Sequence, residues 1–220
     1  ETASSLVPII LKEKWCSDLM GLSLKNITLT VKKGDKPIFK DLGEMMFTHF
    51  GISGPLVLSA SALIDGKISD FKLFVDLKPG LDEQKLDARI LRDFADEKNK
   101  AFRNSLNRLL PRALCSIIVG LSGINAETPV NSITREERRN LVNLIKAMPL
   151  TPIGLRPVEE AVVTRGGVST KEINPKTMES KKLKGLFFCG EVMDVDAVTG
   201  GFNLQIAFST GFLAGTNSVL

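Results

Sequence analysis

The spacing of the apolar residues changes near residue 80, and this change limits the chain to a fold with both sheets and helices. Before it, Ile27, Leu29 and Val31 alternate with polar residues, the pattern of a strand with one buried face. After Lys78-Pro79-Gly80 the apolar residues recur every three or four positions, as in amphipathic helices. The sequence therefore predicts an α+β fold.

Several strands are predicted around this switch. The residues from Lys33 to Lys36 predict a hairpin turn, and the segment Phe71 to Leu77 predicts a further strand. Residues 155–164 also read as one strand, which we expect to return to the first region and complete a barrel-like β domain. The short apolar run at residues 185–188 predicts a buried strand.

A helical insertion is predicted between Gly80 and Met148. Its first stripe is Leu86, Ile90 and Phe94, and Pro111 fits the start of a second helix. Thr134 and Glu137 have the spacing of a capping box before a third helix. A short helix near Pro55, capped by Ser53, precedes the insertion.

The stretch from Gly185 to Gly211 combines an acidic residue with two glycines that directly precede a predicted helix. Glu191 follows the predicted strand, and Gly200-Gly201 precede a helix predicted from Asn203 to about Asn217. Helix N-termini present unpaired N–H donors and a partial positive charge, which suit a phosphate or an electron-rich carbonyl. The alternative is a simple turn with a solvated carboxylate, and the spacing alone does not decide between the two.

Composition excludes several classes of protein. The 220 residues are 43% hydrophobic and 25% charged, with a net charge of +4 and no block of like charges, so we expect no nucleic-acid partner. No apolar run approaches the ~20 residues of a membrane span. One histidine and three separated cysteines predict no metal site and a reduced, cytoplasmic protein.

Three segments resemble the YhiN/BaiN-like flavoproteins, a family of NAD(P)/FAD-dependent oxidoreductases. They are "FTHFGISGP" (residues 47–55), "EAVVTRGGVSTKEINPKTMESKKLKG" (160–185) and "GLFFCGEVMDVDAVTGGFNLQIAFSTG" (185–211). The segments occur in the family's order. The insertion from 80 to 148 is similar only in its helical character.

The resemblance implies roles for individual residues. Gly190 and Glu191 would hold the ribityl or pyrophosphate part of FAD. The backbone of Gly166, Gly167 and Val168 would run past the flavin ring. The helix start would present backbone N–H groups to the pyrimidine end of the flavin and stabilise the negative charge of its reduced form. The residues implied there are Gly200, Gly201, Phe202, Asn203, Leu204 and Gln205.

One family feature is absent from this chain. No two of its 18 glycines are spaced i and i+2, so no G-x-G-x-x-G fingerprint for the ADP half of FAD occurs. The resemblance therefore implies the C-terminal portion of a longer flavoprotein whose N-terminal Rossmann half is its missing partner. By itself we expect the chain to be inactive and to bind FAD weakly or not at all.

The resemblance also implies a domain division. Residues 1–78 with 149–164 would form the inserted β domain, residues 79–148 a helical subdomain, and residues 165–220 the last strand and helix of a Rossmann-like FAD domain. Apolar side chains of that last part would need a cover, so we expect self-association or a partner chain. Those side chains are Leu186, Phe187, Phe208 and Phe212.

Two single residues have competing interpretations. His49 has either a catalytic role, as an acid or base in a substrate pocket, or a structural role. With the resemblance taken into account, both roles stay open. Cys189 has no neighbouring cysteine, so we interpret it as a small buried apolar residue rather than a redox thiol.

The leading functional hypothesis is a FAD-dependent oxidoreductase that, with NAD(P)H, reduces or oxidises a small organic substrate. The alternative is a non-catalytic module that binds a substrate or a partner through its β domain.

Overall fold

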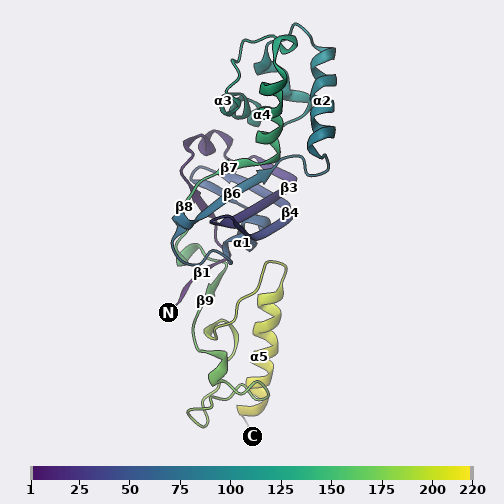
Figure 1. The fold of residues 1–220 in the computed structure, drawn as a ribbon. Helices are drawn as coiled ribbons and strands as arrows, with labels where there is room; N and C mark the ends of the chain where they lie inside the picture. The colour runs from purple at the N-terminus through teal and green to yellow at the C-terminus, as the bar shows by residue number, and fades with distance from the viewer. Residues whose placement is uncertain (1, 219–220) are drawn as a thin grey trace. The chain divides into compact units, whose positions relative to one another are not determined.

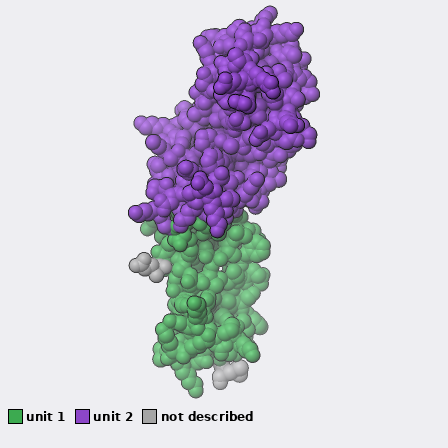
Figure 2. Space-filling view, viewed as in Figure 1, with its two compact units in different colours: residues 1–9, 57–65, 154–220 green, residues 10–56, 66–153 purple. Residues whose placement is uncertain are grey.

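The computed structural model describes residues 2–218 and separates into two compact units, coloured separately in Figure 2. The first unit comprises residues 1–9, 57–65 and 154–220. The second comprises residues 10–56 and 66–153. This division keeps the predicted helical subdomain in one unit with most of the sheet. The domain bounds implied by the family resemblance stay a prediction.

A seven-stranded sheet in the order β7-β6-β3-β4-β5-β2-β8 is the framework of the β-rich part (Figure 1). The pairs of β3 with β4 and β6, of β4 with β5 and of β6 with β7 are antiparallel. This arrangement, with helices inserted between β6 and β7, confirms the α+β fold class. The strands are β2 (Ile9–Leu11), β3 (Ser23–Lys33), β4 (Lys36–Thr48), β5 (Gly51–Ser53), β6 (Phe71–Asp76), β7 (Met148–Leu150) and β8 (Pro152–Leu155).

The predicted hairpin and strand alternation are confirmed. Lys33 pairs with Lys36 across the turn, and Gly34 has the positive φ of 59° that a tight turn requires. Along β3, Leu29 and Val31 are fully buried, while the side chains between them lie on the opposite face. Local chemistry therefore sets the register of the central hairpin.

Three helices form the insertion: α2 (Glu83–Asp96), α3 (Arg112–Ser122) and α4 (Arg135–Lys146). The predicted capping box is present, because the Thr134 hydroxyl accepts from Glu137 N while the Glu137 carboxylate accepts from Thr134 N. Leu86 and Ile90 are buried as the stripe predicts. On α3, Leu114 and Ile118 are buried, whereas Leu121 is 42% exposed.

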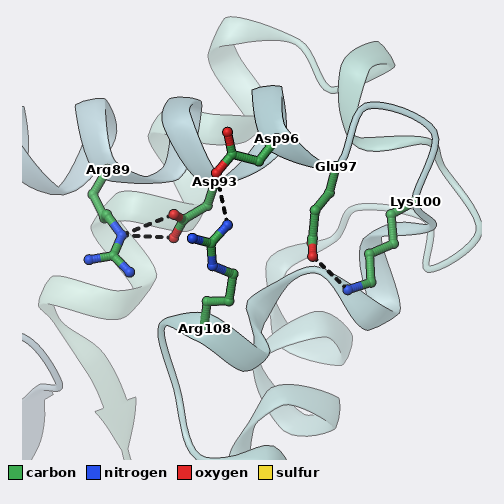
Figure 3. Close-up of polar contacts among 6 residues, drawn as sticks. All are labelled: Arg89, Asp93, Asp96, Glu97, Lys100 and Arg108. Carbon is green, nitrogen blue, oxygen red and sulfur yellow. Dashed lines mark hydrogen bonds and ion pairs between the residues drawn. The ribbon is translucent and has the colours of Figure 1, made fainter.

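A buried carboxylate lies on α2. Asp93 accepts from Arg89 Nε through both carboxylate oxygens, at 3.1 and 2.9 Å (Figure 3). Asp96 pairs with Arg108 at 2.9 Å and Glu97 with Lys100 at 3.0 Å, and both of these pairs are more exposed. The Asp93 pair lies within α2, whereas the Asp96–Arg108 pair joins the end of α2 to the segment that follows it.

The first unit contains a two-stranded sheet and the C-terminal helix. Strands β1 (Ala3–Ser5) and β9 (Val163–Arg165) pair antiparallel, and α5 spans Phe202–Ser218 as predicted. The short helix α1 (Pro55–Ser61) begins at its proline within the predicted region. The predicted cap is wrong, because Ser53 ends β5 and its side chain makes no hydrogen bond to the described part of the chain. The single strand expected at 155–164 is wrong: β8 ends at Leu155, and a 3₁₀ turn (Val158–Glu160) follows Pro157, which has no N–H to continue a ladder.

The predicted strand at residues 185–188 is reduced to a single bridge between Glu179 and Phe187. Ser180 N donates to Leu186 O and Phe188 N donates to Met178 O, so the segment is extended and paired on one side. The pairing does not continue beyond this bridge, so among residues 2–218 the segment forms no regular strand.

A small apolar cluster supports this segment. Its buried members are Ile173, Met178, Met193 and Ala214, and Phe187 and Phe188 pack against it. Phe187 therefore finds a cover within the chain, whereas Leu186, Phe208 and Phe212 are 39%, 69% and 73% exposed. Within residues 2–218 no helix is long and apolar enough to cross a membrane, and no group of histidine, cysteine and acidic residues could hold a metal ion.

Candidate functional site

The start of α5 is shaped by its sequence. Gly200 and Gly201 have φ angles of 117° and 90°, which side-chain-bearing residues rarely adopt. They turn the chain into the helix without placing a β-carbon at its N-terminus. The first N–H groups of a helix have no intrahelical acceptor, so this end offers donors to a bound group.

The loop before α5 is tied down at three points of the first unit. The Asn203 amide holds Ala197 from both sides: Oδ1 accepts from Ala197 N and Nδ2 donates to Ala197 O, each at 2.8 Å. Ser5 Oγ donates to Asp196 at 2.6 Å, and the Ser59 and Thr199 hydroxyls lie 2.9 Å apart. These contacts fix the loop, and with it the cavity that the loop borders.

The cavity has a volume of about 340 Å³ and lies at the start of α5. It brings together six residues of the predicted cofactor site: Gly190, Glu191, Gly200, Gly201, Asn203 and Leu204. Its remaining lining is apolar and comes from Val162, Val163, Val195, Val198, Ile206 and Ala207. An apolar cavity with a few convergent polar groups is the usual form of a cofactor or substrate site.

Gly190 binds the middle of α5. Its N–H donates to the Thr210 hydroxyl at 2.9 Å, and that hydroxyl donates in turn to Ile206 O at 2.7 Å. A β-carbon at Gly190 would lie 3.8 Å from the Ala207 methyl group. The small side chain of Ala207 thus permits the close approach of the Gly190 backbone to α5. At Gly211 and Gly215 an added β-carbon would meet no atom of the described chain within 4 Å.

Glu191 already has a partner within the chain. Its Oε1 atom accepts a hydrogen bond from Thr164 N, which joins the acid to β9. The side chain is exposed and borders the cavity. One carboxylate oxygen therefore holds the acid at the edge of the cavity.

The double glycine that follows β9 lies beside the Glu191 segment rather than in the cavity. Val168 N donates to Val192 O at 2.9 Å, and Asp194 N donates to Val168 O at 2.8 Å. Gly166 and Gly167 both have positive φ angles, of 88° and 123°. The close backbone approach gives Gly167 a structural reason to be glycine, besides the exposure of a ring face that the resemblance implies.

Phe202 and Gln205 lie on the first turn of α5 but do not line the cavity. Gln205 N donates to Gly201 O at 3.0 Å, so this N–H is used within the helix. The Phe202 side chain is 56% exposed. The backbone N–H donors that face outward at this helix end thus belong to the residues before Gln205.

His49 lies in the second unit, in the turn between β4 and β5. Its ring is exposed and meets the Phe50 ring edge-on at 4.9 Å between centroids. Its catalytic role stays a prediction. Cys189 is exposed, so its interpretation as a buried residue is wrong. The one-sided pairing of residues 185–188 explains this exposure.

The valines that line the cavity were not identified from the sequence, nor was Thr210, which accepts a hydrogen bond from Gly190. Val162 and Val163 come from the strand region, about 40 residues before the helix they face, and no local pattern joins them. The three-residue spacing of Val192, Val195 and Val198 was a usable signal for Val195 and Val198. No comparable signal marked Thr210, because α5 also contains other polar residues such as Gln205 and Ser209.

The family comparison settles what kind of chain carries this site. The family described as "HI0933-like protein barrel and H2TH domain" matches residues 3–163. The chain belongs to the HI0933-like family. The match covers the barrel-like strands and the helical insertion, and the family resemblance seen in the sequence is thereby confirmed.

Three curated relatives are similar to this HI0933-like chain over most of its length. The ribosomal RNA dihydrouridine synthase of Haemophilus influenzae is 36% identical over 211 residues, 95% of this chain and 50% of that protein. The protein of the same name from Escherichia coli is 30% identical over 214 residues, 96% of this chain and 50% of that protein. The 3-dehydro-bile acid delta(4,6)-reductase of Clostridium scindens is 31% identical over 199 residues, 83% of this chain and 45% of that protein. The chain spans about half the length of these relatives.

Proposed function

We propose that this chain carries part of the flavin site of a FAD-dependent reductase. The observation that carries the proposal is the convergence of Gly190, Glu191 and the bare start of α5 on one cavity. This convergence unites residues that the sequence separates by up to 14 positions. Membership of the HI0933-like family supports the assignment.

The volume and the lining of the cavity support a site for one part of FAD. Its walls of Val195, Val198 and Ile206 suit the apolar face of a ring system, and the helix start suits an electron-rich edge. At about 340 Å³ the cavity is at the lower end of ligand sites, so it would hold one portion of the cofactor. In the proposal, the rest of FAD contacts a dinucleotide-binding half that carries the G-x-G-x-x-G fingerprint.

Each residue has a defined task in the proposal. The N–H groups before Gln205 stabilise negative charge at the flavin edge by the logic of an oxyanion hole. Gly200 and Gly201 keep that helix end free of side chains, and Glu191 accepts hydrogen bonds from ribityl hydroxyls. When bound, a reduced flavin supplies a hydride to the substrate.

The proposed reaction is the reduction of a carbon–carbon double bond conjugated with a carbonyl, with NAD(P)H as the reductant. Dihydrouridine differs from uridine by two hydrogens across the ring double bond beside a carbonyl. A 3-dehydro bile acid with 4,6 double bonds has the same conjugated arrangement. The names of the relatives thus point to one reaction type on unlike substrates. The proposal includes a cytoplasmic setting, which the three free cysteines support.

A flavin titration tests the proposal. FAD is added to the chain alone and to the chain co-expressed with the G-x-G-x-x-G half of a relative, and the flavin spectrum and fluorescence are followed. We expect weak or no binding alone and tight binding together. Leu204→Glu should weaken the joint binding about tenfold or more, because it places a carboxylate at the cavity beside the flavin edge.

Ser209→Glu is the matched control, since it adds the same charge to α5 at an exposed position that does not line the cavity. Equal affinity for the two variants would contradict the assignment of the cavity. An absence of flavin in every combination would favour the non-catalytic binding module instead.

A further inference from the structure

The outer face of the central strands β3, β4 and β6 carries an unusual set of side chains. Leu29 and Val31 of β3 face the core, so Thr28, Thr30 and Lys32 face outward. The register places Thr30 between Lys40 of β4 and Phe74 of β6, and Lys32 beside Lys72 of β6. We call Thr28, Thr30, Lys32, Lys40, Lys72 and Phe74 the outer sheet face.

This outer sheet face is hollowed. A groove of about 510 Å³ runs over Thr28, Thr30, Lys32, Lys40 and Phe74, and Lys146 from the end of α4 closes it. All of these residues belong to the second unit. The groove is therefore a feature of one compact unit and is separate from the cavity at α5.

The charges on the outer sheet face are not balanced. Asp76, the acid that lines the groove, is paired with Lys146 at 2.7 Å, and Lys146 also donates to the Lys78 and Leu81 carbonyls. Lys32, Lys40 and Lys72 form no ion pair with any residue between 2 and 218.

Like charges on adjacent strands destabilise a sheet. The neighbouring lysines Lys32 and Lys72 therefore bring a cost that an anionic partner would offset. This cost is the reason to regard the three lysines as a binding feature rather than a solvated surface.

An aromatic ring lies among these lysines. Phe74 is half-buried in the groove, and Lys32 Nζ lies 5.2 Å from the centre of its ring. An aromatic side chain on a sheet surface is a platform on which an unstacked base can lie, and neighbouring lysines neutralise phosphates. The Thr28 and Thr30 hydroxyls add donors and acceptors that suit a ribose 2′-hydroxyl.

We propose that the outer sheet face binds single-stranded RNA, with phosphates at Lys32, Lys40 and Lys72 and a base on Phe74. A planar lipid surface meets protruding side chains, whereas Phe74 is recessed in a groove that admits a base. Two curated relatives act, by name, on ribosomal RNA, which favours RNA over other polyanions.

This proposal departs from the expectation of no nucleic-acid partner. That expectation averages charge along the sequence, where the three lysines are separated by up to 40 positions. Strand pairing gathers them on one face. The surface is distinct from the proposed flavin site and does not depend on the flavin chemistry.

The test measures binding of this chain to a short fluorescein-labelled single-stranded RNA by fluorescence anisotropy over a range of salt concentrations. No flavin is added, so failure of the reductase proposal cannot alter the result. The variant Lys32→Gln/Lys40→Gln/Lys72→Gln should reduce the slope of log affinity against log salt by about 2, because each lost phosphate contact on a single strand contributes about 0.7. Phe74→Leu should weaken binding about fivefold or more at constant salt slope.

The matched control is Lys98→Gln/Lys176→Gln/Lys184→Gln, which removes the same charge from exposed positions elsewhere. Circular dichroism and melting temperature verify that each variant is folded. The proposal is overturned if the unmodified chain does not bind the RNA, or if the two triple variants have the same salt slope. Binding to phosphatidylglycerol vesicles without binding to RNA would also overturn it.

Discussion

Gly167 lies against the carbonyl group of Val192, so closely that a β-carbon at position 167 would approach the Val192 oxygen to 2.4 Å. The same oxygen accepts a hydrogen bond from Val168 N at 2.9 Å. This contact joins the double-glycine segment to the segment that carries Glu191. The proposed flavin site is thus assembled by backbone contacts between two segments about 25 residues apart in the sequence.

Gly167→Ala should lower the free energy of unfolding by about 2–4 kcal/mol, from the strain of a φ of 123° and the overlap with Val192. Urea denaturation measures this loss. Gly185→Ala is the control, because its φ of 81° is also positive but its β-carbon meets nothing within 4 Å. Equal losses in both variants would show that Val192 moves aside and that the φ angle alone matters.

Thr210→Val should separate Gly190 from α5. The change keeps the side-chain volume but removes the hydroxyl that accepts from Gly190 N at 2.9 Å. We expect a loss of about 1–2 kcal/mol in urea denaturation, because the Gly190 N–H is left without its partner. The flavin affinity of the assembled protein should fall as well, since Gly190 borders the cavity.

Thr216→Val is the matched control on the same helix. The Thr216 hydroxyl is exposed and donates only to Phe212 O, one turn earlier. Its removal should leave both stability and flavin affinity unchanged. If the two threonine variants behave alike, the Gly190–Thr210 contact does not support the site.

Asp93→Asn should destabilise the helical insertion. The Asp93 side chain is 6% exposed and accepts from Arg89 through both oxygens, so its charge is used inside the structure (Figure 3). A hydrogen bond to a charged group contributes more than a neutral one, and we expect a loss of about 1–2 kcal/mol after solvent screening at Arg89. Thermal unfolding followed by circular dichroism measures the change.

Asp96→Asn provides the comparison for Asp93. Its partner Arg108 is half exposed, and ion pairs of this kind contribute little to stability. We expect no measurable change in its unfolding curve. A larger loss of stability for Asp96→Asn than for Asp93→Asn would contradict the view that burial makes the Asp93 ion pair the more stabilising one.

Structural features that depend on neighbouring residues could be predicted from the sequence. Features that depend on contacts between distant residues could not. The hairpin at Gly34 and the capping box of Thr134 and Glu137 were predictable because each signal lies within four residues. The prediction of one strand through Pro157 was wrong, because it gave more weight to the apolar residues than to the missing N–H of the proline. The grouping of lysines on three strands was invisible, since only the register brings Lys32 and Lys72 together.

The three cysteines should differ in reactivity. Burial, with the Glu13 carboxylate nearby, raises the pKa of the Cys16 thiol to about 12, and burial also raises the pKa of Cys115. The thiolate is the reactive form, so a raised pKa suppresses reaction at mildly alkaline pH. Titration with a chromogenic disulfide should therefore detect one accessible thiol, the exposed Cys189, in the folded chain.

Denaturation should release all three thiols in the same assay. Cys189→Ser should remove the reaction of the folded chain, whereas Cys115→Ser should leave it intact. Rapid reaction of the folded Cys189→Ser variant would show that the regions around Cys16 or Cys115 open readily.

The apolar face of α5 should cause self-association of the chain when no other protein covers it. Leu204, Phe208 and Phe212 recur every four residues and are 63%, 69% and 73% exposed, so they form one apolar stripe. Phe208→Gln/Phe212→Gln should lower the average mass measured by sedimentation at high protein concentration. The control Leu91→Gln/Leu121→Gln removes two exposed leucines from other helices and should not change that mass. A monomeric unmodified chain at the same concentration would contradict the role of this stripe, because exposed aromatic surface of this extent would then be tolerated in water.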